Sequence, residues 1–348
     1  MNDPLEYSKI LKSDLFEILT FSEENLQQLK ARHVVILGGT GFVGKWLVTS
    51  LLEANLRLKL GIKLTLVTRS AKNAERIFNS ASNHFLELLE IDLLNVKDSE
   101  LPRNAEIYVH AATPSVPETG SLNSSGVRSA TFHGAEIIEA ALHESSSQNT
   151  NVIHLSSGAV YSSLNTDYGM PKPEVELDRD TLFERDYAAT KLETEFRIKN
   201  LESRLSTSIS NPRLFAFAGP HLALDQHFAV GNFMKDALLG QDVILKGHPD
   251  TVRSYMYPTD LVKVLIHLMV YPNSNALNVG SPYKIRLGDL AQKISRDFGN
   301  KRWQAENSSN LPNTYYPQIS GQNHIIDQDE LVSIDDSLRR WHSWIRSV

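Results

Sequence analysis

Short apolar runs, several of them rich in β-branched residues, alternate with stretches whose apolar side chains recur at helical spacing. Runs of this kind that end at glycine or polar residues are typical of buried β-strands. They occupy residues 33–37, 64–67, 88–91, 107–110 and 151–155, and later strands are expected at 208–217 and 276–279. Because helical stretches separate several of these strands, the pattern predicts βαβ units. The expected fold class is therefore α/β, with a doubly wound parallel sheet and helices on both faces.

The first strand ends in a glycine-rich turn that leads into a helix. Gly38 would allow the tight turn, Gly41 would let the backbone approach a pyrophosphate, and Gly44 would let the helix pack on the strand. The helix N-terminus offers free N–H groups and the positive end of its dipole to phosphates. This context favours a dinucleotide site over a glycine turn without a ligand. The predicted contacts are Gly38, Thr40, Gly41, Phe42, Val43 and Gly44.

The segment after the second strand bears on the choice of cofactor. Arg69 and Ser70 stand where an NAD-selective site usually has an acid, and both could bind a 2′-phosphate. This favours NADP, with NAD possible; the alternative is a surface arginine. After the third strand, Asp92 could accept a hydrogen bond from an adenine amino group, with Leu93 beside it. The alternative for Asp92 is a helix N-cap.

Tyr187 and Lys191 are four residues apart and would share one face of a helix that starts near Tyr187. An ammonium beside a phenol favours the phenolate and lowers the tyrosine pKa, so Tyr187 could move a proton while a hydride moves at carbon. Alone, this spacing is a frequent accident. After the fifth strand, however, Ser156 and Ser157 place hydroxyls at the carboxyl edge of the sheet, where doubly wound proteins bind ligands.

Taken in order, these motifs resemble one family from about residue 33 to the end. The set is GGTGFVG at 38–44, Asp92, His110-Ala111-Ala112-Thr113, SSGAVY at 156–161, YAATK at 187–191, Pro212-Arg213 with Ala218-Gly219-Pro220, and RSYMYPTD at 253–260. It resembles the extended short-chain dehydrogenase/reductases that act on nucleotide sugars. The resemblance implies a modified Rossmann fold with a smaller substrate-binding lobe.

The resemblance also assigns roles. Ser157 would bind the reacting sugar oxygen, Tyr187 would be the acid/base, and Lys191 would hold the nicotinamide ribose and tune Tyr187. Arg253 resembles the arginine that grips the substrate diphosphate, with a structural salt bridge to Asp260 as the alternative. Further cofactor contacts would come from Ala111, Ala112, Thr113 and Pro212, and further substrate contacts from His227 and Asn232. The alternative for His227 is a loop histidine or a helix cap.

Four departures from the family pattern narrow the chemistry. Gly158 and Ala159 stand where dehydratases have an Asp-Glu pair and decarboxylases keep a glutamate, so neither reaction has its main acid/base group. Thr131 and Ala216 replace asparagines, which indicates a different pose of the bound nucleotide and sugar.

The surviving chemistry is hydride transfer at a sugar carbon. We expect an NDP-hexose 4-epimerase, in which Tyr187 takes the C4 hydroxyl proton and a hydride leaves C4 and returns to its other face. The first alternative is an NADPH-dependent reductase of NDP-4-keto-6-deoxyhexoses, which Arg69 favours. A remote alternative is a non-catalytic NADP(H)-sensing protein, against which Tyr187 and Lys191 argue.

The domain division follows from these assignments. Residues 1–30 would form a helical extension, and residues 31–215, with 254–283 contributing, the NAD(P)-binding domain. Residues 216–253 and 284–348 would form the smaller lobe. By analogy with the family, a homodimer is expected through two helices that carry Ala135, Ile137, Ile138, Ala141, Leu192 and Phe196.

The amino-acid composition excludes several other kinds of site and binding partner. The 348 residues include no cysteine, so disulfides, thiolate nucleophiles and cysteine-based metal sites are excluded. The twelve histidines are scattered, and no metal site is expected. A net charge of -6 gives no general attraction to nucleic acid or to anionic membranes. Without a signal-like start or a long apolar run, a cytoplasmic location is expected.

Overall fold

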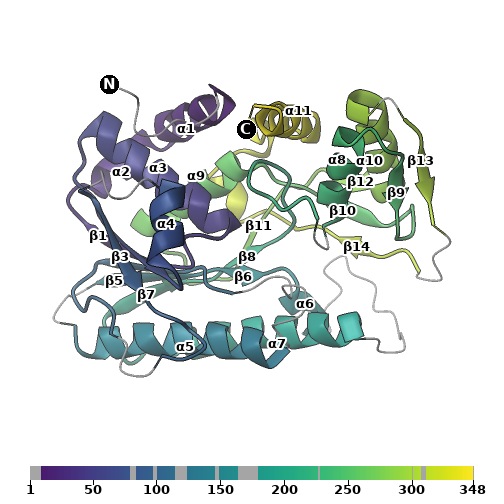
Figure 1. Ribbon diagram of the computed structural model, residues 1–348. Coiled ribbons are helices and arrows are strands. Elements are labelled where there is room, and N and C mark those ends of the chain that lie inside the picture. The colour runs from purple at the N-terminus through teal and green to yellow at the C-terminus, as the bar shows by residue number, and fades with distance from the viewer. Residues whose placement is uncertain are drawn as a thin grey trace.

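Figure 1 shows a computed structural model of the chain, in which a layered α/β body carries a smaller lobe at one side. The structure describes residues 9–78, 84–96, 100–113, 124–145, 149–163, 179–225, 228–299, 301–306 and 311–347.

The body is built on six parallel strands in the order β3-β2-β1-β4-β5-β7. They are β1 (His33–Leu37), β2 (Lys63–Thr68), β3 (Leu86–Glu90), β4 (Ile107–His110), β5 (Thr150–His154) and β7 (Thr207–Ser210). The five apolar runs in the first half of the chain are therefore confirmed as strands, and so is the doubly wound parallel sheet. The chain steps outward from β1 to β3 and then returns to place β4 on the other side of β1.

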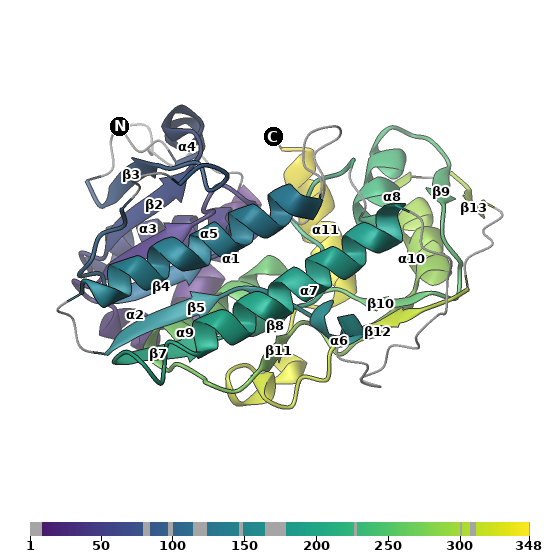
Figure 2. The same cartoon turned by 90° about the horizontal axis from the view of Figure 1, so that it is seen from below.

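Helices cover both faces of this sheet (Figures 1 and 2). One face carries α1 (Lys9–Phe21), α2 (Glu23–Gln28), α3 (Phe42–Leu58) and α9 (Pro258–Val270), and the other carries α5 (Ser124–His143) and α7 (Arg179–Lys199), which lie side by side. Consecutive residues of β1 alternate between the two layers, so that Ile36 joins the first apolar cluster and Val35 the second. The short helix α4 (Ala71–Phe78) follows β2.

Two strands at the edge of the sheet continue beyond it. β6 (Ser156–Ser157) follows β5, β8 (Pro212–Leu214) follows β7, and both join β11 (Leu277–Val279) in a sheet ordered β11-β8-β6. The single strand predicted at 208–217 is wrong in this respect, because Pro212 has no N–H to donate and the pairing changes at Asn211. The strand predicted at 276–279 is confirmed.

The smaller lobe has its own apolar core, which includes Phe233, Leu290 and Trp341. Its sheets are ordered β12-β10-β14 and β13-β9. The elements are α8 (Ala229–Leu238), β9 (Val243–Leu245), β10 (Val252–Ser254), β12 (Lys284–Arg286), α10 (Leu287–Ile294), a π-helical turn (Ser295–Gly299), β13 (Trp303–Ala305), β14 (Thr314–Tyr315) and α11 (Ile334–Ile345). The 3₁₀ turns at Gln322–His324 and Gln328–Glu330 pack on the body instead, where Ile326 and Leu331 join its apolar cluster. The domain boundaries assigned from the sequence stay a prediction.

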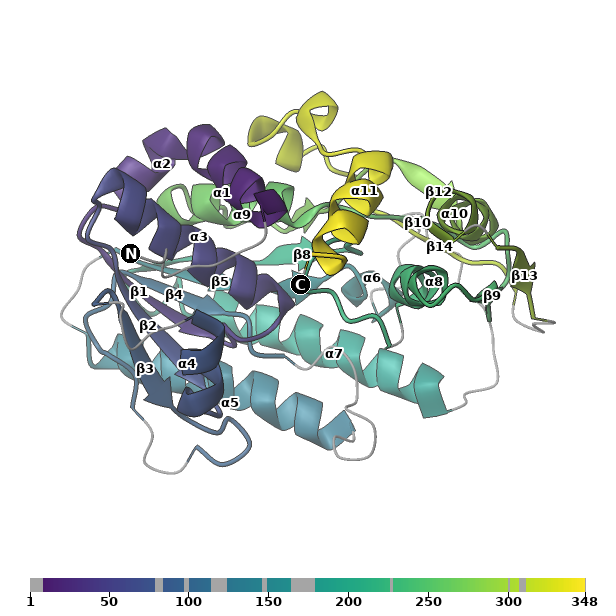
Figure 3. The same ribbon diagram turned by 45° about the horizontal axis from the view of Figure 1, so that its top comes forward.

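The N-terminal helices pack on the body through buried charges as well as apolar side chains (Figure 3). Asp14 of α1 accepts hydrogen bonds from Tyr257 at 2.6 Å and from Arg340 at 2.9 Å. Lys263 of α9 donates to Glu17 at 2.7 Å. Burial raises the pKa of Asp14 to about 6. The α1 helix is therefore fastened to both α9 and α11.

Helix α7 begins at Arg179, eight residues before the predicted start at Tyr187. Residues 179–186, which precede Tyr187, are mostly polar but include neither glycine nor proline, so nothing in them interrupts a helix. Tyr187 and Lys191 therefore lie inside a long helix, where the backbone is held on both sides.

Candidate functional site

The glycine turn lies where the sheet reverses its strand order, between β1 and β4. Gly38 has a positive φ of 83°, and a Cβ at this position would meet backbone atoms of Ala111 and Ala112 at 2.7 Å. Only glycine fits such a conformation and such a close approach. The crevice at this switch point is where open α/β sheets bind their ligands.

The N-terminus of α3 directly follows this turn and has no side-chain cap. Gly41 is its N-cap residue, and the helix starts at Phe42. A Cβ on Gly44 would lie 2.3 Å from the Cα of Gly39, so the helix can pack on the turn only because Gly44 has no side chain. Uncapped N–H groups at a helix N-terminus suit the phosphates of a dinucleotide. Thr40 and Val43 lie in the same segment and are partly buried.

The end of β2 carries charges of both signs. Arg69 is exposed there, and the Ser70 hydroxyl accepts from the N–H of Asn73 at 3.2 Å. The N–H of Ala71 donates to the carboxylate of Glu90 at 2.7 Å. Sequence reasoning missed Glu90, whose register opposite Thr68 in the neighbouring strand was the available signal.

Asp92 and Leu93 follow β3, and both make hydrogen bonds within the protein. The Asp92 carboxylate accepts from the N–H of Leu94 at 3.0 Å, which is a local turn contact; residues 91–96 form no helix, so this contact is not the helix N-cap of the alternative. Leu93 is buried in the core, and its carbonyl lies 2.8 Å from the Nδ1 of His133. The backbone carbonyl of Leu93 therefore contacts α5 through His133.

Ser157, Tyr187 and Lys191 come together at the carboxyl edge of the sheet. Ser157 ends β6 and is hydrogen-bonded with the Tyr187 hydroxyl of α7. The Nζ of Lys191 donates to the Thr113 hydroxyl at 2.8 Å and to the Leu155 carbonyl at 2.5 Å. The predicted serine, tyrosine and lysine thus share one site, and Thr113 joins them from the segment after β4.

Burial sets the electrostatics of this group. It raises the pKa of Tyr187, and the hydrogen bond with Ser157 opposes that rise. It lowers the pKa of Lys191 to about 7, and the negative charge of Glu195 opposes that fall. The net shift in the pKa of Tyr187 is therefore upward, opposite to the direction that its spacing from Lys191 predicts, because desolvation outweighs the hydrogen bond with Ser157.

Thr131, which departs from the family pattern, is part of the same network. Its hydroxyl lies 3.1 Å from that of Thr113 and donates to the Val127 carbonyl at 2.8 Å. Its carbonyl accepts from the Nε2 of His110 at 2.8 Å. Thr113 is thereby held between Thr131 and Lys191.

An aromatic wall adjoins Ser157, and we use this name for Phe215, Tyr161 and Tyr315. A Cβ on Gly158 would lie 2.5 to 2.7 Å from ring carbons of Phe215. The ring of Phe215 is 4.8 Å from that of Tyr315 and 6.4 Å from that of Tyr161. Sequence reasoning treated Tyr161 as a core or ligand-edge aromatic and missed Phe215 and Tyr315. No local signal identifies them, since they reach the site from distant strands.

The wall connects the catalytic candidates to Arg253 of β10. The guanidinium of Arg253 lies 6.0 Å from the centre of the Tyr315 ring and donates to the side chain of Asn313 at 2.6 Å. Asp260, the alternative partner of Arg253, instead pairs with Lys263 at 3.1 Å. A ligand that spans from Ser157 to Arg253 would therefore run along aromatic rings.

The remaining predicted contacts are less closely placed. Asn232 is partly buried in the first turn of α8, in the smaller lobe, and Pro212 is buried at the start of β8. His227 lies outside the described residues. Among the described residues, no three His, Cys, Asp or Glu side chains are grouped to hold a metal ion. In that same part of the chain, no helix is long and apolar enough to span a bilayer.

A parallel sheet with a glycine turn at its switch point defines a Rossmann-type dinucleotide-binding protein. A model of the NAD dependent epimerase/dehydratase family matches residues 34–280. The chain therefore belongs to this family of extended short-chain dehydrogenase/reductases, and the predicted fold and enzyme class are confirmed.

Proteins similar to this chain in sequence or in fold carry the names of several activities. UDP-glucuronic acid decarboxylase 3 of Arabidopsis thaliana is 24% identical over 315 residues, which cover 88% of this chain and 86% of that protein. The epimerase Mth375 of Methanothermobacter thermautotrophicus has a TM-score of 0.73 and 18% identity, covering 94% of this chain and 96% of its own. DesIV, a dTDP-glucose 4,6-dehydratase of Streptomyces venezuelae solved with NAD and TYD bound, has a TM-score of 0.71 and 17% identity, covering 90% and 97%.

The geometry of the glycine turn gives a first prediction. Gly38→Ala forces a Cβ against the backbone after β4, so we expect cofactor affinity to fall at least about ten-fold and the protein to lose stability. Gly240→Ala is the matched control, because Gly240 also has a positive φ, 66°, but has no atom within 4 Å of an added Cβ. It should cost about 1–2 kcal/mol of stability and leave affinity unchanged. Calorimetric titration with NAD and NADP, beside thermal unfolding, separates the two effects; equal affinities for both variants would contradict the assignment.

Proposed function

We propose that the protein is an NAD(P)-dependent 4-epimerase of a nucleotide-activated hexose. The observation that carries this proposal is the joint placement of Ser157, Tyr187 and Lys191 beside the glycine-turn crevice, with Gly158 covered by Phe215. The cofactor would supply one function, the removal and return of a hydride. All other steps of the reaction fall to side chains of this chain.

Ser157 would bind the reacting C4 oxygen and Tyr187 would take its proton, since the two hydroxyls are already hydrogen-bonded to each other. Lys191 would bind the nicotinamide ribose and stabilise the tyrosine phenolate with its positive charge. The segment from Gly38 to Gly44 would hold the pyrophosphate. Arg253 would bind the substrate diphosphate as a bidentate donor.

The aromatic wall explains why dehydration and decarboxylation are not proposed, although relatives carry both names. In the resemblance, the acid/base groups of those reactions stand at positions 158 and 159, which are Gly158 and Ala159 here. A carboxylate at position 158 would also have to displace the ring of Phe215. The place of a charged acid/base group is therefore taken by an apolar surface.

Turnover without added cofactor is the test of this proposal. Purified protein incubated with a panel of UDP- and dTDP-hexoses should interconvert one C4-epimer pair, because an epimerase regenerates its bound cofactor in each cycle. Chromatography with mass spectrometry would identify the sugar and any nucleotide that co-purifies. Strict dependence on added NADPH would support the reductase alternative, which Arg69 favours, and release of carbon dioxide or water from the sugar would overturn the proposal.

Tyr187→Phe is part of the same test. It should lower kcat at least about 100-fold while cofactor binding persists, since only the proton-transferring hydroxyl is lost. Tyr271→Phe is the control, because Tyr271 is an exposed residue after α9. Wild-type turnover by Tyr187→Phe would revive the non-catalytic sensing alternative.

Two charged side chains at the ends of β2 and β3 predict the preference between NAD and NADP. The guanidinium of Arg69 would bind a 2′-phosphate, whereas the nearby carboxylate of Glu90 would repel it. Arg69→Ala should lower affinity for NADP about ten-fold and leave NAD unchanged, and Glu90→Gln should raise affinity for NADP. Fluorescence titration of the wild type and of each variant with NAD and with NADP measures the dissociation constants. Parallel changes for NAD and NADP would contradict a role at the 2′ position.

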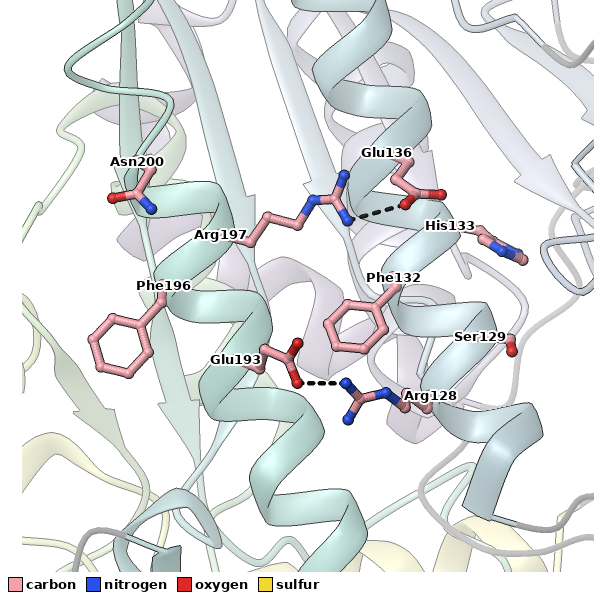
Figure 4. Close-up of a pocket in the computed structure, with 9 residues that line it drawn as sticks. All are labelled: Arg128, Ser129, Phe132, His133, Glu136, Glu193, Phe196, Arg197 and Asn200. Carbon is pink, nitrogen blue, oxygen red and sulfur yellow. Dashed lines mark hydrogen bonds and ion pairs between the residues drawn. The ribbon is translucent and has the colours of Figure 1, made fainter.

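The outer face of α5 and α7 is the proposed homodimer contact. This face has a hollow of about 670 Å³. In Figure 4 the pairs Arg128–Glu193 and Arg197–Glu136 lie on either side of Phe132. Phe196 is 61% exposed on the same face. Large exposed aromatic side chains are favoured at protein interfaces.

Phe196→Glu tests this contact. A buried charge would oppose association, so the variant should elute as a monomer where the wild type elutes as a dimer in light-scattering chromatography. Phe16→Glu is the matched control, because Phe16 is 60% exposed on α1, outside this face. A monomeric wild-type protein, or equal dimerisation by Phe196→Glu, would contradict the proposal.

A further inference from the structure

A buried ion pair lies directly behind the catalytic candidates. Arg213 donates to Glu195 through Nε at 3.0 Å and through Nη2 at 2.7 Å, and the Ser156 hydroxyl donates to the same carboxylate. The side chains of Arg213 and Glu195 are only 11% and 8% exposed. A bidentate pair that is so well shielded has a defined geometry, unlike an exposed one.

The three residues come from three different elements of the site. Ser156 is the neighbour of Ser157 on β6, and Arg213 pairs with it in register on β8. Glu195 lies on α7, one helical turn after Lys191 and two turns after Tyr187. The cluster therefore joins the strand that carries the predicted sugar-binding serine to the helix that carries the predicted acid/base and its lysine.

We infer that Glu195 is a positioning residue, which fixes β6 against α7 through Ser156 and Arg213 and keeps Lys191 charged. This inference rests on the roles proposed above for Ser157, Tyr187 and Lys191. Neither a sugar nor a cofactor has to touch Glu195 for it to act. Its effect passes through the register of Ser157 with Tyr187 and through the electric field at Lys191.

The charges around Lys191 support the second part of the inference. On α7 it lies one helical turn from Tyr187 and one from Glu195, whose negative charge favours the ammonium. The charge of Lys191 also acts on His110 of β4 and His154 of β5. Burial, together with that charge, lowers the pKa of both histidines, which leaves them neutral at pH 7. Arg213 faces Glu195 from β8. The carboxylate of Glu195 is thus the charge that opposes the desolvation of the Lys191 ammonium.

The test reads the charge of Lys191 directly. Protein labelled with ¹³C at the lysine ε-carbons is titrated by NMR, and the Lys191 signal is assigned by its absence from Lys191→Met. Glu195→Gln removes the negative charge that favours the ammonium and leaves Arg213 unpaired, so the midpoint should move to lower pH by about one unit. Glu195→Asp, which keeps the charge, should have a Lys191 midpoint close to that of the wild type.

Ser156→Ala tests positioning without a change of charge. It should leave the Lys191 midpoint unchanged and lower kcat at least about ten-fold, with KM for the sugar unaltered, because Ser157 loses its fixed distance from Tyr187. Glu144→Gln is the control: Glu144 forms an exposed ion pair with Arg103 at 2.7 Å, away from the site. It should change neither quantity.

The two outcomes that overturn the inference are separate from failure of the proposed function. A Lys191 midpoint that is the same in Glu195→Gln as in the wild type excludes tuning by Glu195, whatever the substrate. Wild-type kcat in Ser156→Ala excludes positioning, even if Glu195→Gln does not fold. If no nucleotide sugar is turned over, the proposed function fails while the NMR titration still decides the charge of Lys191.

Discussion

Lys191 exposes 3% of its surface, and an ammonium removed from water costs several kcal/mol unless other groups replace that water. Here the Thr113 hydroxyl and the Leu155 carbonyl accept its hydrogen bonds, and Glu195 supplies an opposite charge. These partners belong to the segment after β4, to the end of β5 and to α7. Burial of one charged group thus requires the elements of the candidate site to meet at one point.

The candidate site is built from both lobes. After β5 and β7 the chain leaves the central sheet to form β6 and β8, and β8 leads from Arg213 to Phe215, which covers Gly158. Tyr315 of the smaller lobe stacks on Phe215 and carries the aromatic surface toward Arg253. The body therefore supplies the hydroxyls, the ammonium and the ring of Phe215, and the smaller lobe adds Tyr315 and Arg253.

Local patterns in the sequence predict the body well, because its determinants are local. The strand of residues 33–37 is a buried apolar run, and the glycine after it is required by a single backbone conformation at Gly38. The aromatic wall and the Arg213–Glu195 pair depend on contacts between residues far apart in the chain. Phe215 gives no sign in the sequence that it covers Gly158. Glu195 did offer one, since it follows Lys191 by one helical turn on the same face of α7.

A positive charge near a tyrosine favours loss of its proton, and Lys191 lies one helical turn from Tyr187 on α7. His110 and His154 are neutral at pH 7, so the positive charges of this layer are those of Lys191 and Arg213, and Glu195 supplies the negative one. Burial raises the pKa of Tyr187, and the hydrogen bond with Ser157 opposes that rise. A protonated histidine in the same layer would instead repel Lys191 and favour loss of its proton. Neutral imidazoles therefore preserve a positive charge one helical turn from the tyrosine, where it can stabilise a phenolate.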